Sequence, residues 1–95
     1  MSVSLAAKTG LAIALLGGVI EYHAAPDPAT QTEFLERLTV RVERASTLTP
    51  ETRASVTRVV ERALAVPGHD AKSEQRRQNA IVRLESALRA VPDRN

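Results

Sequence analysis

Residues 3–20 read VSLAAKTGLAIALLGGVI and form the one long apolar run of the chain. As a helix, these 18 residues would be about 27 Å long, close to the hydrocarbon thickness of a bilayer. Lys8 interrupts the run, so a span would require its ammonium group to reach back to the N-terminal surface. Tyr22 follows the apolar end, where an interfacial aromatic residue is expected. The run therefore predicts a signal-anchor or transmembrane helix within residues 1–25.

Two other interpretations of this run remain open. Lys8 and the apolar residues 11–20 also fit the charged and apolar regions of a cleaved secretory signal. Cleavage after Ala24 would put the bulky Tyr22 where a small residue is needed, which favours retention. An apolar segment of about 10 to 14 residues is also typical of a helix buried in a soluble bundle or a larger assembly.

Small residues recur at every fourth position of the run. They would lie along one helix face, and small residues at this spacing let two helix backbones approach closely. Small residues are common throughout the run, so flexible apolar filler is an equally good interpretation of the pattern. We nevertheless predict a helix-packing interface in the membrane at these positions: Ala6, Gly10, Ala14 and Gly18.

Prolines separate the apolar run from the rest of the chain. Pro26 and Pro28 prevent one continuous helix, and either Asp27 or Thr30 can cap a new one. We therefore expect an apolar helix in residues 1–25, a proline-rich boundary at 26–32 and a small helical domain at 33–95.

Three amphipathic segments follow the apolar run. The first is predicted to begin at Pro28 or Gln31 and to end near Ser46, and the second to run from about residue 50 to residue 66. The third ends before Pro92, and its polar start at residues 69–79 fits either a loop or a helix. We expect the tail after Pro92 to fray.

The fold class is therefore all-α, with an N-terminal apolar helix followed by a small amphipathic domain of two to three helices. Apolar residues alternate at spacings of three and four in these helices, which predicts one buried stripe on each. The predicted bundle core or partner surface comprises Leu35, Leu38, Val42, Val60, Ile81, Leu84 and Leu88.

The composition favours an interaction protein over an enzyme. The chain has no cysteine, and its two histidines lack the spacing of a zinc site. Its serines and threonines lie in no glycine elbow, and no phosphate-binding loop follows its glycines. We therefore expect no catalytic activity, no cofactor, no metal and no small-molecule substrate.

The charge pattern indicates the kind of partner. Basic and acidic residues are interleaved at a net charge of +2, unlike the one-sided basic stripe of a nucleic-acid-binding protein. Arg76 and Arg77 form the most basic local patch, but Glu74 lies beside them and a solvated helix face is the favoured interpretation. We expect other protein subunits, in a homo- or hetero-oligomer, and a membrane as partners.

These features predict a non-catalytic, single-pass membrane protein that acts as an accessory or scaffold subunit and assembles with other proteins through its helices. Lys8 precedes the apolar run, whereas Glu21 and Asp27 follow it, so the positive-inside rule places the N-terminus in the cytoplasm. In a bacterium this puts the protein in the inner membrane with its helical domain in the periplasm. The alternative is a soluble structural subunit of a virion or filament, whose N-terminal helix packs against neighbouring copies.

Overall fold

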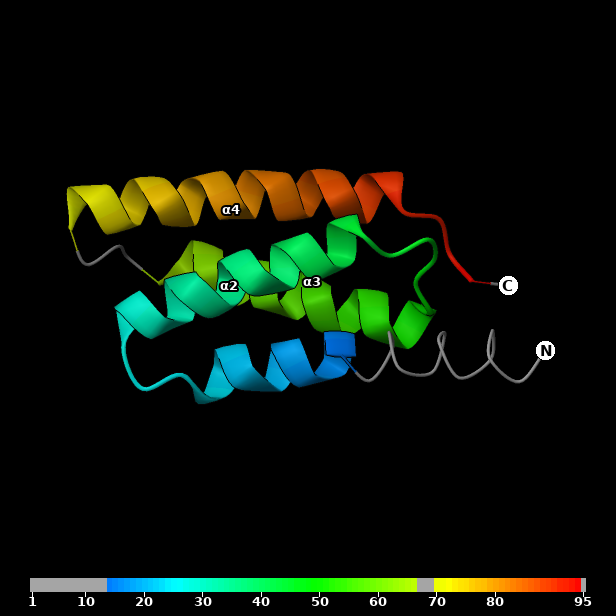
Figure 1. Cartoon of the computed structure of the whole chain (residues 1–95), viewed down its shortest axis with the longest axis horizontal. Coiled ribbons are helices and arrows are strands. Elements are labelled where there is room, and N and C mark those ends of the chain that lie inside the picture. Colours follow the sequence, from blue (N-terminus) through cyan, green and yellow to red (C-terminus); the bar gives the residue numbers. More distant parts are fainter. Residues whose placement is uncertain (1–13, 67–69, 95) are drawn as a thin grey trace.

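A computed structural model describes residues 14–66 and 70–94, and these residues form α-helices joined by short connections. An N-terminal helix, described over residues 14–24, precedes α2 (Pro28–Glu43), α3 (Pro50–Ala65) and α4 (Ala71–Ala90). Consecutive helices run in opposite directions, so the described helices form an up-and-down bundle (Figure 1). The predicted all-α fold class is confirmed for this part of the chain.

Each of the three complete helices begins with a side-chain cap. Asp27, Thr49 and Asp70 each accept a hydrogen bond from the backbone N–H three residues further on. A proline follows the cap of α2 and of α3, where its missing N–H has no consequence. The cap at Asp70 means that the polar residues at the start of α4 are helical and do not form a loop.

One apolar core runs through the bundle, and the N-terminal helix contributes to it. Leu15, Val19 and Tyr22 are buried in the same cluster as the apolar stripes of α2, α3 and α4. The described residues before the proline-rich boundary therefore share a core with the domain that follows it. Of the residues predicted for the core, six are buried in this cluster and Leu88 packs against it half-buried. The six are Leu35, Leu38, Val42, Val60, Ile81 and Leu84.

Helix α4 packs against α2, and the two helices run parallel. Glu36 pairs with Arg76 at 2.5 Å, and one heptad further on Glu43 pairs with Arg83 at 2.5 Å. Between these pairs the fully buried Thr39 donates to its own helix, at the Leu35 carbonyl, over 2.8 Å. Thr39 also donates a longer hydrogen bond of 3.4 Å to the Ala80 carbonyl on α4. This bond and the two ion pairs set the register of α2 against α4.

The chain turns earlier after α2 than the sequence pattern predicts. The helix ends at Glu43, three residues before the predicted end, because the Ala45 N–H bonds to the Val42 carbonyl in a tighter turn. This turn brings Leu48 back into the core, where its side chain is 2% exposed. Burial of Leu48 therefore ends α2 before its apolar pattern does.

Within residues 14–66 and 70–94, no helix has both the length and the apolar character needed to cross a membrane.

Candidate functional site

The N-terminal helix carries apolar side chains beyond the side that the bundle covers. Its inner side carries Leu15, Val19 and Tyr22, which are at most 8% exposed. Its outer side carries Leu16, which is 42% exposed, and Ile20, which is 68% exposed. Large apolar side chains such as these are normally covered, by protein or by lipid, when they gather on one helix. Within the described residues, the bundle covers only the inner side of this helix.

Gly18 lies in a tight contact between the N-terminal helix and α2. A Cβ atom at this position would lie 3.0 Å from Arg41 Nη1 and 3.2 Å from Leu38 Cδ1. Arg41 uses the space to donate a hydrogen bond of 3.0 Å to the carbonyl of Ala14. Two of the four small residues predicted to pack on a helix, Ala14 and Gly18, therefore contact α2 of their own chain.

The other small residues are placed differently. A Cβ atom at Gly17 would meet nothing within 4 Å, so this glycine faces open space on the outer side. Ala6 and Gly10 lie outside the described residues, as does most of the predicted membrane span. The predicted contact of these small residues with another helix in the membrane therefore stays a prediction.

Tyr22 packs the C-terminal end of the N-terminal helix into the bundle. Its side chain is 2% exposed, and its ring meets that of His23 edge to face at 5.5 Å. Burial raises the pKa of the Tyr22 phenol, and the nearby positive charges of Arg62 and Arg77 partly oppose this rise. Tyr22 is the sole tyrosine of a chain without tryptophan, so its optical signals report on this contact alone.

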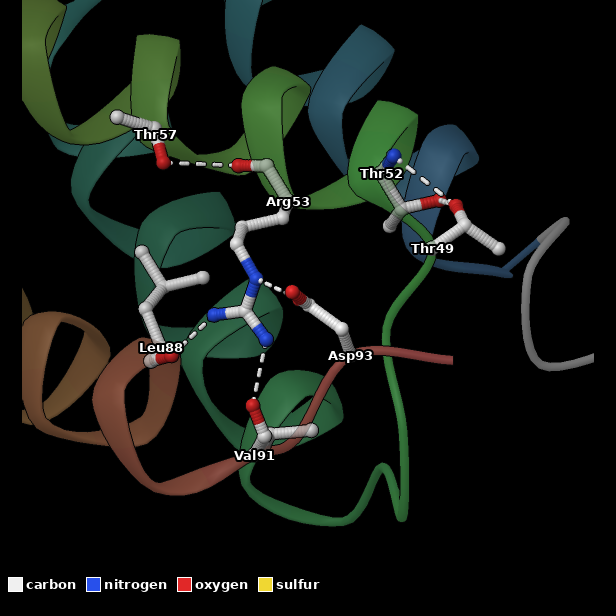
Figure 2. A network of polar contacts seen from close by, with 7 residues as sticks. All are labelled: Thr49, Thr52, Arg53, Thr57, Leu88, Val91 and Asp93. Atoms are coloured by element: carbon white, nitrogen blue, oxygen red, sulfur yellow. Dashed lines mark hydrogen bonds and ion pairs between the residues drawn. The ribbon is translucent and has the colours of Figure 1, made fainter. Parts of the chain in front are cut away.

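Arg53, in the first turn of α3, binds the end of α4 (Figure 2). Its guanidinium donates to the carbonyls of Leu88 and Val91, the latter at 2.5 Å. It also pairs with Asp93 at 2.6 Å. The last carbonyls of a helix have no partner within the helix, so Arg53 supplies hydrogen bonds that α4 cannot make itself.

The C-terminal tail is held in place by the same region, in contrast to the frayed tail expected from the sequence. The Leu48 N–H donates to the Pro92 carbonyl over 2.9 Å, and the Arg94 N–H donates to the Leu48 carbonyl over 2.7 Å. Together with the Arg53–Asp93 ion pair, these backbone bonds join the tail to the connection between α2 and α3. The expectation of fraying is therefore wrong for the described residues of the tail.

The basic patch predicted at Arg76 and Arg77 is paired within the chain. Arg76 binds Glu36 on α2, and Arg77 binds Glu74 at 2.5 Å on its own helix. Arg77 also donates to the carbonyl of Ala63 in the last turn of α3. The α3 and α4 helices therefore exchange caps, because an arginine near the start of each one binds the end of the other.

The remaining described surface offers open grooves. One of them, between α3 and α4, has a volume of about 360 Å³ and is lined by Leu64, Ile81 and Val82 with polar residues at its rim. No group of three histidine, aspartate or glutamate side chains within the described ranges is placed to hold a metal ion. The most distinctive feature for function is therefore the N-terminal helix, which has apolar side chains exposed to solvent as well as apolar side chains in the core.

The arginines that join helices could not be identified from hydrophobic periodicity. Arg41, Arg53 and Arg77 fall on polar positions of their helices, where a pattern of apolar residues predicts only solvent contact. Arg53 does carry one signal, because a cation in the first turn of a helix is unfavourable with the helix dipole. A basic residue in such a position indicates a partner outside its own helix.

No protein-family model, no curated protein and no solved structure matches the chain.

Proposed function

We propose that this protein is a non-catalytic assembly subunit that is attached to a membrane through its N-terminal helix and binds other protein subunits through its helices. The observation that carries this proposal is that the N-terminal helix has large apolar side chains both on and beyond the side that packs on the bundle. Leu15, Val19 and Tyr22 are buried against the bundle, whereas Leu16 and Ile20 lie exposed on the outside.

The sequence before the described helix favours lipid as the cover of its outer side. Residues 3–13 immediately precede this helix in the sequence and are mostly apolar or small. Together with residues 14–20 they make a run of 18 residues, which approaches the length that a transmembrane helix requires. An exposed apolar face that continues into an apolar run is better matched by hydrocarbon than by water.

The polar side chains support a structural role over a catalytic one. The carboxylates of Glu36, Glu43 and Glu74 pair with arginines. The guanidiniums of Arg53 and Arg77 bind backbone carbonyls at helix ends. These groups hold the helices of the chain together, so their charges have a structural use.

Flotation of the full chain with phosphatidylcholine vesicles tests the membrane proposal. Ile20→Glu places a charge on the outer side of the N-terminal helix and is expected to abolish flotation. Val82→Glu is the matched control, because Val82 on α4 is 62% exposed against 68% for Ile20. This control is expected to float like the unmodified chain. Equal flotation of the two variants, or no flotation of the unmodified chain, would contradict the proposal.

The second candidate function is a soluble structural subunit that assembles with its own copies. Gly17 favours it, because this glycine faces open space beside the exposed Ile20 and leaves room for a neighbouring helix. Sedimentation velocity distinguishes the two candidates. The soluble subunit would be supported by a mass that rises with protein concentration and that falls to the monomer mass in Ile20→Glu. The unmodified chain should then also fail to float with vesicles.

We further propose that a membrane-inserted chain keeps its N-terminus in the cytoplasm and α2–α4 on the other side, which is the periplasm in a bacterium. Lys8 before the apolar run is the basis for this orientation. Added protease should then cleave α2–α4 in spheroplasts without lysis. Protection of these helices until the cells are lysed would reverse the orientation.

A further inference from the structure

The polar contacts of the bundle are distributed unequally among its helices. Helices α2 and α4 are joined by the Glu36–Arg76 and Glu43–Arg83 ion pairs, and α3 and α4 exchange arginine caps. Between residues 14–24 and the other described residues there is no ion pair, and one side-chain hydrogen bond joins them. The N-terminal helix is thus held on the bundle mainly by apolar packing.

Lipid can replace the bundle as the apolar surroundings of this helix. Leu15, Val19 and Tyr22 are removed from water when they pack on the bundle, and hydrocarbon would remove them from water as well. Leu16 and Ile20 are exposed while the helix is docked, and a bilayer would cover them. Against this, departure of the helix exposes the side of α2 that carries Leu38.

We propose that residues 14–24 are a releasable helix, docked on α2 in the absence of a membrane and separated from the bundle when the helix enters a bilayer, while α2–α4 remain folded. This inference rests on the proposed membrane function for the destination of the helix. Docking and release are themselves measurable without lipid, so the two proposals can fail separately.

Two adjacent glycines provide a matched pair of variants. In Gly18→Leu the new side chain enters the contact with Arg41 and Leu38, whereas in Gly17→Leu the same side chain enters open space. Both variants add the same apolar group to the same helix, so a difference between them reports docking and not hydrophobicity. Overpacking of such a contact is expected to raise the released fraction about tenfold.

Tyr22 reports the docked state directly, since its fluorescence and near-ultraviolet circular dichroism are not obscured by tryptophan. Without lipid, Gly18→Leu should increase quenching of Tyr22 by acrylamide and weaken its circular dichroism, and Gly17→Leu should change neither. Amide hydrogen exchange should show that α2–α4 stay protected in both variants. With phosphatidylcholine vesicles, Gly18→Leu should bind more tightly than Gly17→Leu.

Equal quenching of Tyr22 in the two glycine variants would overturn the inference. Should Gly18→Leu unfold the whole chain, Arg41→Ala decides, because it removes the hydrogen bond to Ala14 without altering the N-terminal helix. If Tyr22 becomes exposed while the amides of α2–α4 stay protected from exchange, release is supported. If Tyr22 burial and the amide protection of α2–α4 are lost together, the inference is overturned. Release of Tyr22 in variants that bind no vesicles would retain the releasable helix and reject the membrane function.

Discussion

Replacing Arg53 by methionine tests how the end of α4 is held. Arg53 donates to two carbonyls at this end, and its side chain is 26% exposed, so water reaches the site only in part. A hydrogen bond from a charged donor contributes about 1.5 to 3 kcal/mol, but carbonyls at a helix end recover some hydration when the donor is removed. The exposed partner Asp93 adds at most about 1 kcal/mol. We therefore expect Arg53→Met to lower the free energy of unfolding by about 2 to 3 kcal/mol.

Thermal unfolding followed by far-ultraviolet circular dichroism measures this loss. For a domain of this size the midpoint should fall by roughly 8 to 24 °C. Arg58→Met is the matched control, because Arg58 is exposed on the same helix, and its midpoint should change little. Arg53→Lys should recover only part of the loss, since an ammonium group cannot reproduce the planar fork of the guanidinium. A midpoint for Arg53→Met equal to that of Arg58→Met would refute the capping role.

Three further predictions concern the packing of the N-terminal helix and of α2. Gly17→Ala should raise the free energy of unfolding by about 0.5 to 1 kcal/mol in urea denaturation. Gly18→Ala should gain less, because its Cβ is crowded by Leu38, and equal gains would contradict the close contact. Thr39→Val should change the free energy of unfolding by less than about 1 kcal/mol. Valine has the shape of threonine, and the Leu35 carbonyl keeps its backbone hydrogen bond within the helix. A loss above about 2 kcal/mol would contradict this prediction. The docked state should lose stability as the pH rises above the ordinary tyrosine pKa of 10.0, because docked Tyr22 keeps its proton while the released phenol loses it. Near-ultraviolet circular dichroism of Tyr22 measured against pH checks this, and a signal unchanged until α2–α4 unfold would contradict it.

The helices themselves follow from local sequence signals. Asp27, Thr49 and Asp70 are caps that the sequence displays, and two of them precede a proline. The stripes of apolar residues predict which sides face the core, because burial follows the helical period. The end of α2 is missed, since burial of Leu48 from the connection depends on contacts with residues far along the chain.

Only part of the candidate site can be predicted from the sequence. The apolar run is visible in the sequence, but apolar composition does not distinguish a helix packed on its own bundle from a helix in lipid. Gly18 illustrates the difficulty, because its small size fits contact with a partner subunit and contact with α2 equally well. The arginines that cap neighbouring helices depend on tertiary distances, which hydrophobic periodicity does not contain.

Carbonate extraction of membranes from cells that express the full chain tests the central claim most directly. The wash strips proteins that adhere to membranes by charge and leaves inserted helices in place. A chain attached through its apolar N-terminal helix is expected to remain in the membrane pellet until detergent is added. Recovery of the chain in the soluble fraction without detergent would contradict membrane attachment and favour the soluble structural subunit.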